Sequence, residues 1–297
     1  MCGIAGVMIR DPKATGASGP ITDMMEALQR RGPDSAGVAL YGERQAAYRV
    51  SVLLTNPDAE RAEAIDALVR ELDGAVAAVR TEGIYGFLEL ARNLDPMALV
   101  PAIENRPGAH VVGIGQSMML VKDGGSVQEF EDRYAIRSVA SRYAVGHTRL
   151  ATESRVDPMH AQPLWSRYVP DLCVAHNGHI TNDQVLRKTL MTKGYRFTTD
   201  NDSEAISVYL ADKVLQGKSL REAMEDSLRE LDGAFTYIAA SLEGIGVARD
   251  PFAFKPLAVV ETDELVAFAT EYPAVAAVAG YNASVSELNA GEVRVWS

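Results

Sequence analysis

Cysteine is almost absent from this chain of 297 residues, which contains only Cys2 and Cys173. Two cysteines so far apart lack the close spacing of zinc and iron–sulfur sites, and they cannot form a framework of several disulfides. We therefore expect a protein of a reducing, cytoplasmic compartment that holds no metal and has no disulfide scaffold.

An excess of positive charge and a long apolar run are also missing. The chain has 29 Lys and Arg against 40 Asp and Glu, a formal charge of −11. This balance disfavours a nucleic-acid-binding surface, because phosphate binding requires clustered basic side chains. No apolar run has the length of a membrane span, and Arg10 and Asp11 interrupt the first one. We expect no nucleic-acid or membrane partner.

The hydrophobic content of 47% is typical of a globular protein with a sizeable core. The opening residues "CGIAGVMI" predict a buried strand. A helix is expected over about 23–30, with Thr22 as its N-cap, and it ends at Gly32 and Pro33.

The sequence of segment 46–115 predicts two β-α-β units in succession, in the order β-α-β-β-α-β. This order is that of the ferredoxin-like fold. We interpret 46–115 as an inserted subdomain, and the alternative is that these elements only extend the main sheets.

Further along, "RYAVGHTRLA" and "DLCVAHNGHI" predict strands, and a helix is expected to start near Ser203. Ser219 and Glu222 form the pattern of a capping box at the start of the next helix. From Gly244 onward, short apolar strands alternate with turns.

Cys2 directly follows the initiator methionine. If Met1 is removed, Cys2 carries both a thiol and a free α-amine, whose pKa is about 7.7–8.0. A terminal cysteine can therefore supply a nucleophile and its own base. A cysteine at this position is weak evidence by itself.

Acyl transfer also requires hydrogen-bond donors for the tetrahedral oxyanion. Asn177 offers a side-chain amide, and Gly178 offers a backbone N–H that can be approached closely. The alternative is a hairpin turn, because Asn-Gly is a strong hairpin signal.

Two charged positions could bind an amino acid. Arg149 ends a largely apolar strand and could bind a carboxylate in bidentate fashion. Asp200, Asp202 and Glu204 could bind an ammonium group, although acidic residues also favour a helix start.

Seven segments occur in an order that resembles the class II glutamine amidotransferases, which are N-terminal-nucleophile (Ntn) hydrolases. They are "CGIAG", "RRGPDSAG", "GHTRLAT", "HAQPLW", "AHNGHITN", "DSEAI" and "ARDPFAFKPL". The resemblance spans positions 2–256. It implies an α+β fold, the αββα four-layer sandwich of Ntn hydrolases, over residues 2–297, with the ferredoxin-like subdomain inserted at 46–115. It also implies hydrolysis of L-glutamine to glutamate and ammonia without a metal or cofactor.

The resemblance implies the following site residues. Cys2 is the nucleophile, Asn177 and Gly178 form the oxyanion hole, Arg149 holds the α-carboxylate of glutamine, and Asp202 holds its α-ammonium group. Arg31 and Asp34 belong to a supporting turn beside the nucleophile. The motif histidines His147 and His176 are expected to be structural, and Cys173 is expected in the core.

The chain departs from many relatives after the motif arginine. Leu150 replaces an aromatic residue, and Glu153 and Ser154 replace a His-Gly or Ala-Gly pair. These differences concern the loop that closes over glutamine in the family.

The sequence is most similar to free-standing amidotransferase subunits of glutamate-synthase-like systems, including N-methylglutamate synthase. That similarity implies separate partners, an FMN-containing synthase subunit and a subunit like the C-terminal domain of glutamate synthase. Two alternatives remain, an Ntn hydrolase of another amide and a non-catalytic regulatory subunit.

Overall fold

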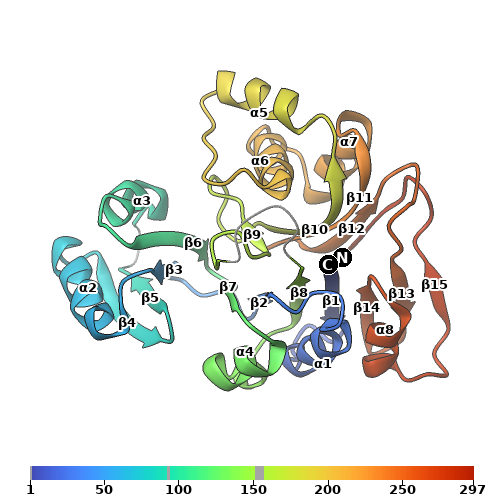
Figure 1. Cartoon of the computed structure of the whole chain (residues 1–297), viewed down its shortest axis with the longest axis horizontal. Helices are drawn as coiled ribbons and strands as arrows, with labels where there is room; N and C mark the ends of the chain where they lie inside the picture. Colours follow the sequence, from blue (N-terminus) through green and yellow to red (C-terminus); the bar gives the residue numbers. More distant parts are fainter. Residues whose placement is uncertain (1, 92–93, 151–156) are drawn as a thin grey trace.

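The structure, a computed structural model, describes residues 2–91, 94–150 and 157–297. Two antiparallel sheets lie face to face, with helices on both outer surfaces (Figure 1). This arrangement is the αββα sandwich predicted from the sequence.

The first sheet has seven strands in the order β15-β13-β14-β1-β8-β2-β7. Its strands are β1 (Gly3–Ile9), β2 (Ser35–Tyr41), β7 (Met118–Gly124), β8 (Tyr143–Arg149), β13 (Ala258–Glu261), β14 (Leu265–Ala269) and β15 (Val285–Glu287). Its outer face is covered by α1 (Ser18–Leu28), α4 (Val127–Tyr134) and α8 (Tyr272–Ala279), with the 3₁₀ turn Ile136–Ser138 after α4 (Figure 1).

The second sheet has five strands in the order β16-β12-β11-β10-β9. Its strands are β9 (Leu164–Trp165), β10 (Cys173–Ile180), β11 (Gly233–Ser241), β12 (Gly244–Arg249) and β16 (Val293–Trp296). Its outer face carries α5 (Asp183–Thr192), α6 (Asp202–Leu215) and α7 (Leu220–Glu230) (Figure 1).

Alternation along the strands divides the core into two parts. On β10, Cys173 and Ala175 face the core between the sheets, whereas Val174 packs with the residues under α5–α7. Successive side chains of a strand point to opposite faces, so a strand that is covered on both faces is mostly apolar. This explains why the predicted strands are almost unbroken apolar runs.

Residues 49–115 form a separate four-stranded antiparallel sheet in the order β4-β5-β3-β6. The elements are β3 (Arg49–Leu54), α2 (Asp58–Glu71), β4 (Val76–Glu82), β5 (Tyr85–Leu90), α3 (Pro96–Glu104) and β6 (Ala109–Gly115). Numbered within the segment, the strand order is 2-3-1-4, which confirms the ferredoxin-like βαββαβ arrangement. We call residues 49–115 the inserted unit; the domain bounds of 2–297 and 46–115 stay a prediction.

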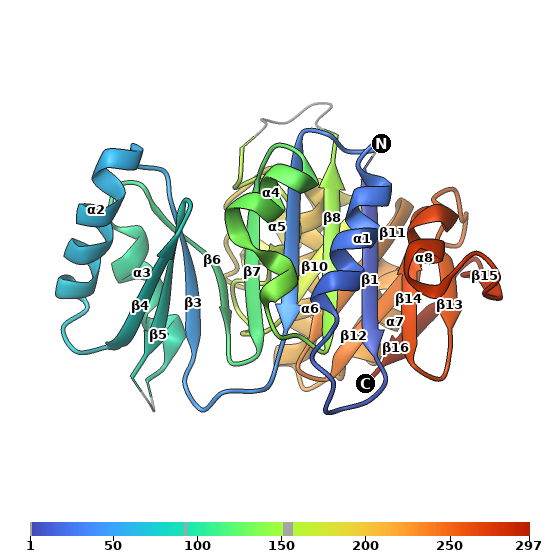
Figure 2. The ribbon, with the colours of Figure 1, turned by 90° about the horizontal axis from the view of Figure 1, so that it is seen from below.

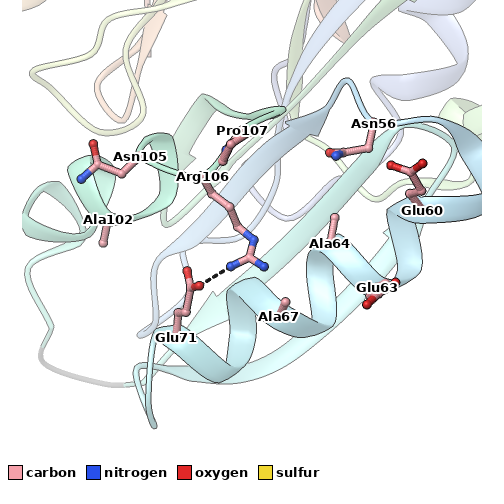
Figure 3. A pocket seen from close by; sticks show the side chains of 10 residues that line it. All are labelled: Asn56, Glu60, Glu63, Ala64, Ala67, Glu71, Ala102, Asn105, Arg106 and Pro107. Atoms are coloured by element: carbon pink, nitrogen blue, oxygen red, sulfur yellow. Dashed lines mark ion pairs between the residues drawn. The ribbon is translucent and has the colours of Figure 1, made fainter.

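A cavity of about 490 Å³ lies in the inserted unit between α2 and the residues after α3 (Figure 3). Glu60 and Glu63 line it, and Glu71 forms an ion pair with Arg106 across it. The inserted unit lies at the far end of the molecule from the amino terminus (Figure 2).

Three local predictions are corrected. The first helix begins at Ser18 with Ala17 as its N-cap, and Thr22 lies inside it, bonded to Ser18 O at 2.8 Å. Pro20 lies in the first turn, where a proline is tolerated because its missing N–H has no helical acceptor. The tail contains α8 among its strands. Asn177 and Gly178 form no hairpin, because both lie within β10 and pair with β11.

The capping box of Ser219 and Glu222 is confirmed. Within the described residues, no helix has both the length and the apolar character that a bilayer span requires.

Packing between the sheets predicts that replacing two phenylalanines, one buried and one exposed, destabilises the protein to very different extents. Phe268 is fully buried and stacks on Trp296 with ring centroids 5.2 Å apart. Phe268→Ala should lower the free energy of unfolding by about 3–5 kcal/mol, measured by urea denaturation, because it leaves a cavity. Phe252 is 69% exposed, so the control Phe252→Ala should cost no more than about 0.5 kcal/mol. Equal losses would contradict this assignment of the core.

Candidate functional site

The five residues with predicted direct roles come together in one cavity of about 950 Å³. One lies directly before β1, one ends β8, two lie within β10, and the fifth starts α6. They are Cys2, Arg149, Asn177, Gly178 and Asp202. The cavity shares no lining residue with the one in the inserted unit.

The carbonyl of Cys2 is held by donors from two directions. Asn177 Nδ2 on β10 donates to Cys2 O at 3.3 Å, and Arg31 Nε donates to the same oxygen at 3.1 Å. Arg31 also pairs with Glu271 at 2.5 Å. The thiol of Cys2, which is partly buried, donates to Leu150 O at 3.8 Å. The backbone of Cys2 is thus fixed while its side chain lines the cavity.

The predicted supporting turn contacts both sides of the site. Arg31 reaches Cys2, and the backbone N–H of Asp34 donates to Arg149 O at 3.0 Å. Arg149 is the last residue of β8 and is 4% exposed. The turn therefore positions the end of β8 next to the start of β1.

Gly178 occupies a position that only glycine fits. Its φ is +139°, and a Cβ there would lie 2.2 Å from Ala234 O on the paired strand. L-residues with side chains rarely adopt this backbone conformation. The glycine therefore lets β10 stay paired with β11 at the position that lines the cavity.

Asp202 is held as a carboxylate at the start of α6. Its Oδ2 accepts from Ile180 N at 3.0 Å, and its oxygens lie 3.5 Å from His176 Nδ1 and 3.6 Å from His179 Nδ1. Burial alone would raise the pKa of Asp202, but the charge and hydrogen bond of His176 and the Ile180 N–H lower it to about 2. Asp202 therefore places a negative charge in the cavity at neutral pH.

The other two acidic candidates differ in position. Asp200 also lines the cavity. Glu204 is buried, and its oxygens accept bonds of 2.7–2.8 Å from the N–H and hydroxyl groups of Thr198 and Thr199. Glu204 thus fixes the turn before α6. The predicted helix start near Ser203 is confirmed, because α6 begins at Asp202 with Asn201 as its N-cap.

The motif histidines are enclosed. Burial, together with the charge of Arg149, lowers the pKa of His147 to about 3, so it is neutral at physiological pH. His176 Nδ1 lies 2.9 Å from Ser203 Oγ. Cys173 is fully buried and burial raises its pKa to about 12, which confirms the prediction that it belongs to the core.

Several cavity residues were missed at the level of sequence. His160, Gln162, His179 and Lys255 line the cavity, and all lie within the recognised motifs. Motif membership was the only signal that could have identified them. In the described part of the chain, no three His, Cys, Asp or Glu side chains gather in a way that could hold a metal ion.

Met1, Glu153 and Ser154 lie outside the described residues. The role of the Cys2 α-amine, which depends on removal of Met1, and any effect of the changes at Glu153 and Ser154 therefore stay expectations from the sequence.

The family profile and two relatives that match this chain are described as glutamine amidotransferases or as similar to them. The family profile "Glutamine amidotransferase domain" matches residues 147–277. A protein of Methanothermobacter thermautotrophicus named "Putative glutamine amidotransferase" is 38% identical over 100% of this chain and 99% of its own length. The glutamine amidotransferase-like protein GlxB of Rhizobium meliloti is 36% identical over 92% of this chain and 90% of its own.

Among solved structures, glutamine phosphoribosylpyrophosphate amidotransferase from B. subtilis superposes with a TM-score of 0.64 at 20% identity. The match covers 98% of this chain and 46% of that chain, so this chain spans about half the length of the solved enzyme. This likeness confirms the fold.

The lowered pKa of Asp202 predicts an acid-dependent loss of stability. Its ordinary value is 3.8 and its folded value is about 2, so its contribution is present above pH 4 and is lost as the pH falls towards 2. Asp202→Asn lacks this contribution. The difference in free energy of unfolding between wild type and variant should shrink by about 2 kcal/mol between pH 5 and pH 2, measured by urea denaturation. A constant difference would contradict the assigned contacts.

Proposed function

Because this chain belongs to the class II glutamine amidotransferases, which have the Ntn-hydrolase fold, we propose that it hydrolyses L-glutamine to glutamate and ammonia. One observation carries this proposal. A thiol, an amide donor beside it, a buried guanidinium and a carboxylate that stays charged line the same cavity.

Cys2 is the proposed nucleophile. Once Met1 has been removed, the α-amine of Cys2 accepts the thiol proton, and Sγ attacks the side-chain amide carbon of glutamine. The C–N bond then breaks, and ammonia leaves with the proton returned by the α-ammonium group. Water adds to the thioester, the α-amine takes its proton, and glutamate is released as the thiol re-forms.

Asn177 and Gly178 are proposed to stabilise the oxyanion that forms twice in this sequence. The amide of Asn177 already contacts the backbone of Cys2 at 3.3 Å, and Gly178 is its neighbour on β10. Fixed donors of this kind stabilise the transition state more than the ground state. Arg31 and Asp34 support the site by holding Cys2 and Arg149.

Recognition of the amino acid is assigned to opposite charges. Arg149 would bind the α-carboxylate and Asp202 the α-ammonium group. The lowered pKa of Asp202 supports this role, because the carboxylate is ionised throughout the neutral range, in which glutamine carries its ammonium group. A substrate that lacks either charged group should bind more weakly, which distinguishes glutamine from amides that are not amino acids.

The ammonia is proposed to pass to a separate acceptor. Residues 2–297 would form the amidotransferase domain, with 46–115 inserted in it. The proposed partners are an FMN-containing synthase subunit and a subunit like the C-terminal domain of glutamate synthase, as in N-methylglutamate synthase. Ammonia released into water is protonated near neutral pH and loses its nucleophilic lone pair, which favours direct transfer between docked chains.

Removal of the Cys2 thiol tests the reaction. Cys2→Ala should reduce ammonia release from glutamine by at least about 10³-fold, because no other group can form the thioester. Release is measured by a coupled assay for ammonia and glutamate. The control Cys173→Ala removes the other thiol, in the core, and should retain activity within a few-fold.

The same preparations should be examined by mass spectrometry. The mass of the active protein should lack Met1, because a methionine on Cys2 would block the α-amine. Undiminished activity in Cys2→Ala, or full activity with Met1 retained, would contradict the proposed mechanism. Hydrolysis of another amide in preference to glutamine would favour an Ntn hydrolase of a different substrate.

A further inference from the structure

Lys122 is a buried lysine next to the candidate site. It lies on β7, the last strand of the seven-stranded sheet, and is 3% exposed. Its Nζ donates to two backbone carbonyls, Met159 O at 3.1 Å and Ala161 O at 2.9 Å. A buried ammonium group is costly unless it is hydrogen-bonded, so these two carbonyls are what keep the side chain in place.

The carbonyls belong to residues 157–162, which we call the wall segment. His160 and Gln162 of this segment line the cavity that contains Cys2. Gln162 Oε1 accepts from His176 N at 2.6 Å, and His160 Nδ1 lies 2.8 Å from Asp157 Oδ1. The wall segment therefore forms one side of the cavity and is joined to β10.

A glycine next to Lys122 leaves room on the sheet for the wall segment. Gly37 on β2 pairs with Lys122. A Cβ at Gly37 would lie 2.2 Å from Gln162 O and 2.8 Å from Lys122 Cβ. The segment thus packs directly on the backbone of β2, next to the lysine that holds it.

The inserted unit contacts the backbone of the same lysine. Tyr85 on β5 is fully buried, and its hydroxyl accepts from Lys122 N at 3.0 Å and donates to Lys122 O at 2.6 Å. No strand follows β7 in the sheet order of the described residues, so this single hydroxyl replaces the partner that a further strand would supply. The inserted unit and the wall segment therefore meet at Lys122.

We propose that Lys122 is a positioning residue of the glutamine site, which fixes the wall segment and connects it to the inserted unit. This inference rests on the proposed glutaminase activity. Lys122 touches neither the thiol nor the proposed substrate groups; it acts through the backbone of residues 159 and 161.

The strength of this anchor depends on the charge of Lys122. Burial lowers its pKa to about 7, Glu204 on α6 and Asp157 in the wall segment raise it, and Arg149 on β8 lowers it. Bonds from an ammonium group to carbonyls are stronger than those from a neutral amine. The anchor should therefore be strongest below pH 7 and weaken as the pH rises through 7.

The test replaces Lys122 by methionine, which has a similar length and no donor. At pH 6, Lys122→Met should raise KM for glutamine about tenfold, the effect of about 1.4 kcal/mol, and change kcat less than about threefold. At pH 9 the ratio of the two KM values should be clearly smaller. The titration of the Cys2 amine cancels in this ratio, because both proteins contain it.

Hydrogen exchange gives a second measurement that does not depend on activity. Backbone amides of residues 159–165 should exchange faster in Lys122→Met, and also, to a smaller extent, in Tyr85→Phe. The matched control is Tyr237→Phe, which also removes a buried hydroxyl, one that lies 2.6 Å from Ser227 Oγ on α7. It should leave both the exchange of 159–165 and KM unchanged.

The outcomes separate the two proposals. If wild type hydrolyses no glutamine, the proposed function fails, and faster exchange in Lys122→Met still supports the anchor. If wild type is active but Lys122→Met retains its KM at pH 6, or shows the same loss at every pH, the positioning role is refuted. An effect of Tyr237→Phe equal to that of Tyr85→Phe would refute the connection to the inserted unit.

Discussion

The hydrogen bonds to the carbonyl oxygen of Cys2 are the interaction on which the site depends. Asn177 reaches this oxygen from the five-stranded sheet, and Arg31 reaches it from the turn between α1 and β2 while paired with Glu271 at α8. One oxygen thus joins both sheets and the outer helix layer. A displacement of one sheet relative to the other would therefore strain a bond at the residue that carries the thiol.

The features that could be predicted from the sequence are those set by local pattern or by composition. Strands buried on both faces are mostly apolar, so β1 and the first halves of β8 and β10 can be predicted from their apolar runs. The inserted unit was recognised from the order of its strands and helices, and its sheet order follows from that pattern. The site residues came from a set of ordered motifs, and the structure places five of them in one cavity.

The features that could not be predicted depend on contacts distant in sequence. Asn-Gly is a hairpin signal, and only pairing with β11 keeps Asn177 and Gly178 in a strand. His160 and Gln162 line the cavity, and the carbonyls next to them accept bonds from Lys122, almost forty residues earlier. A lysine within an apolar strand has no pattern that distinguishes a buried anchor from an exposed side chain. Helix propensity likewise does not predict that α1 begins at Ser18, before Gly19 and Pro20.

The contact of Tyr85 with β7 places the inserted unit against an edge of the seven-stranded sheet. Exposed sheet edges invite pairing between molecules, and proteins protect them with short strands or covering elements. At one edge of the seven-stranded sheet, β15 has only three residues; at the other, β3 and β6 of the inserted unit pack against β7, which has seven residues. Deleting the inserted unit would therefore uncover a long edge that promotes aggregation. Solubility alone would then favour keeping this insertion, whatever else it contributes.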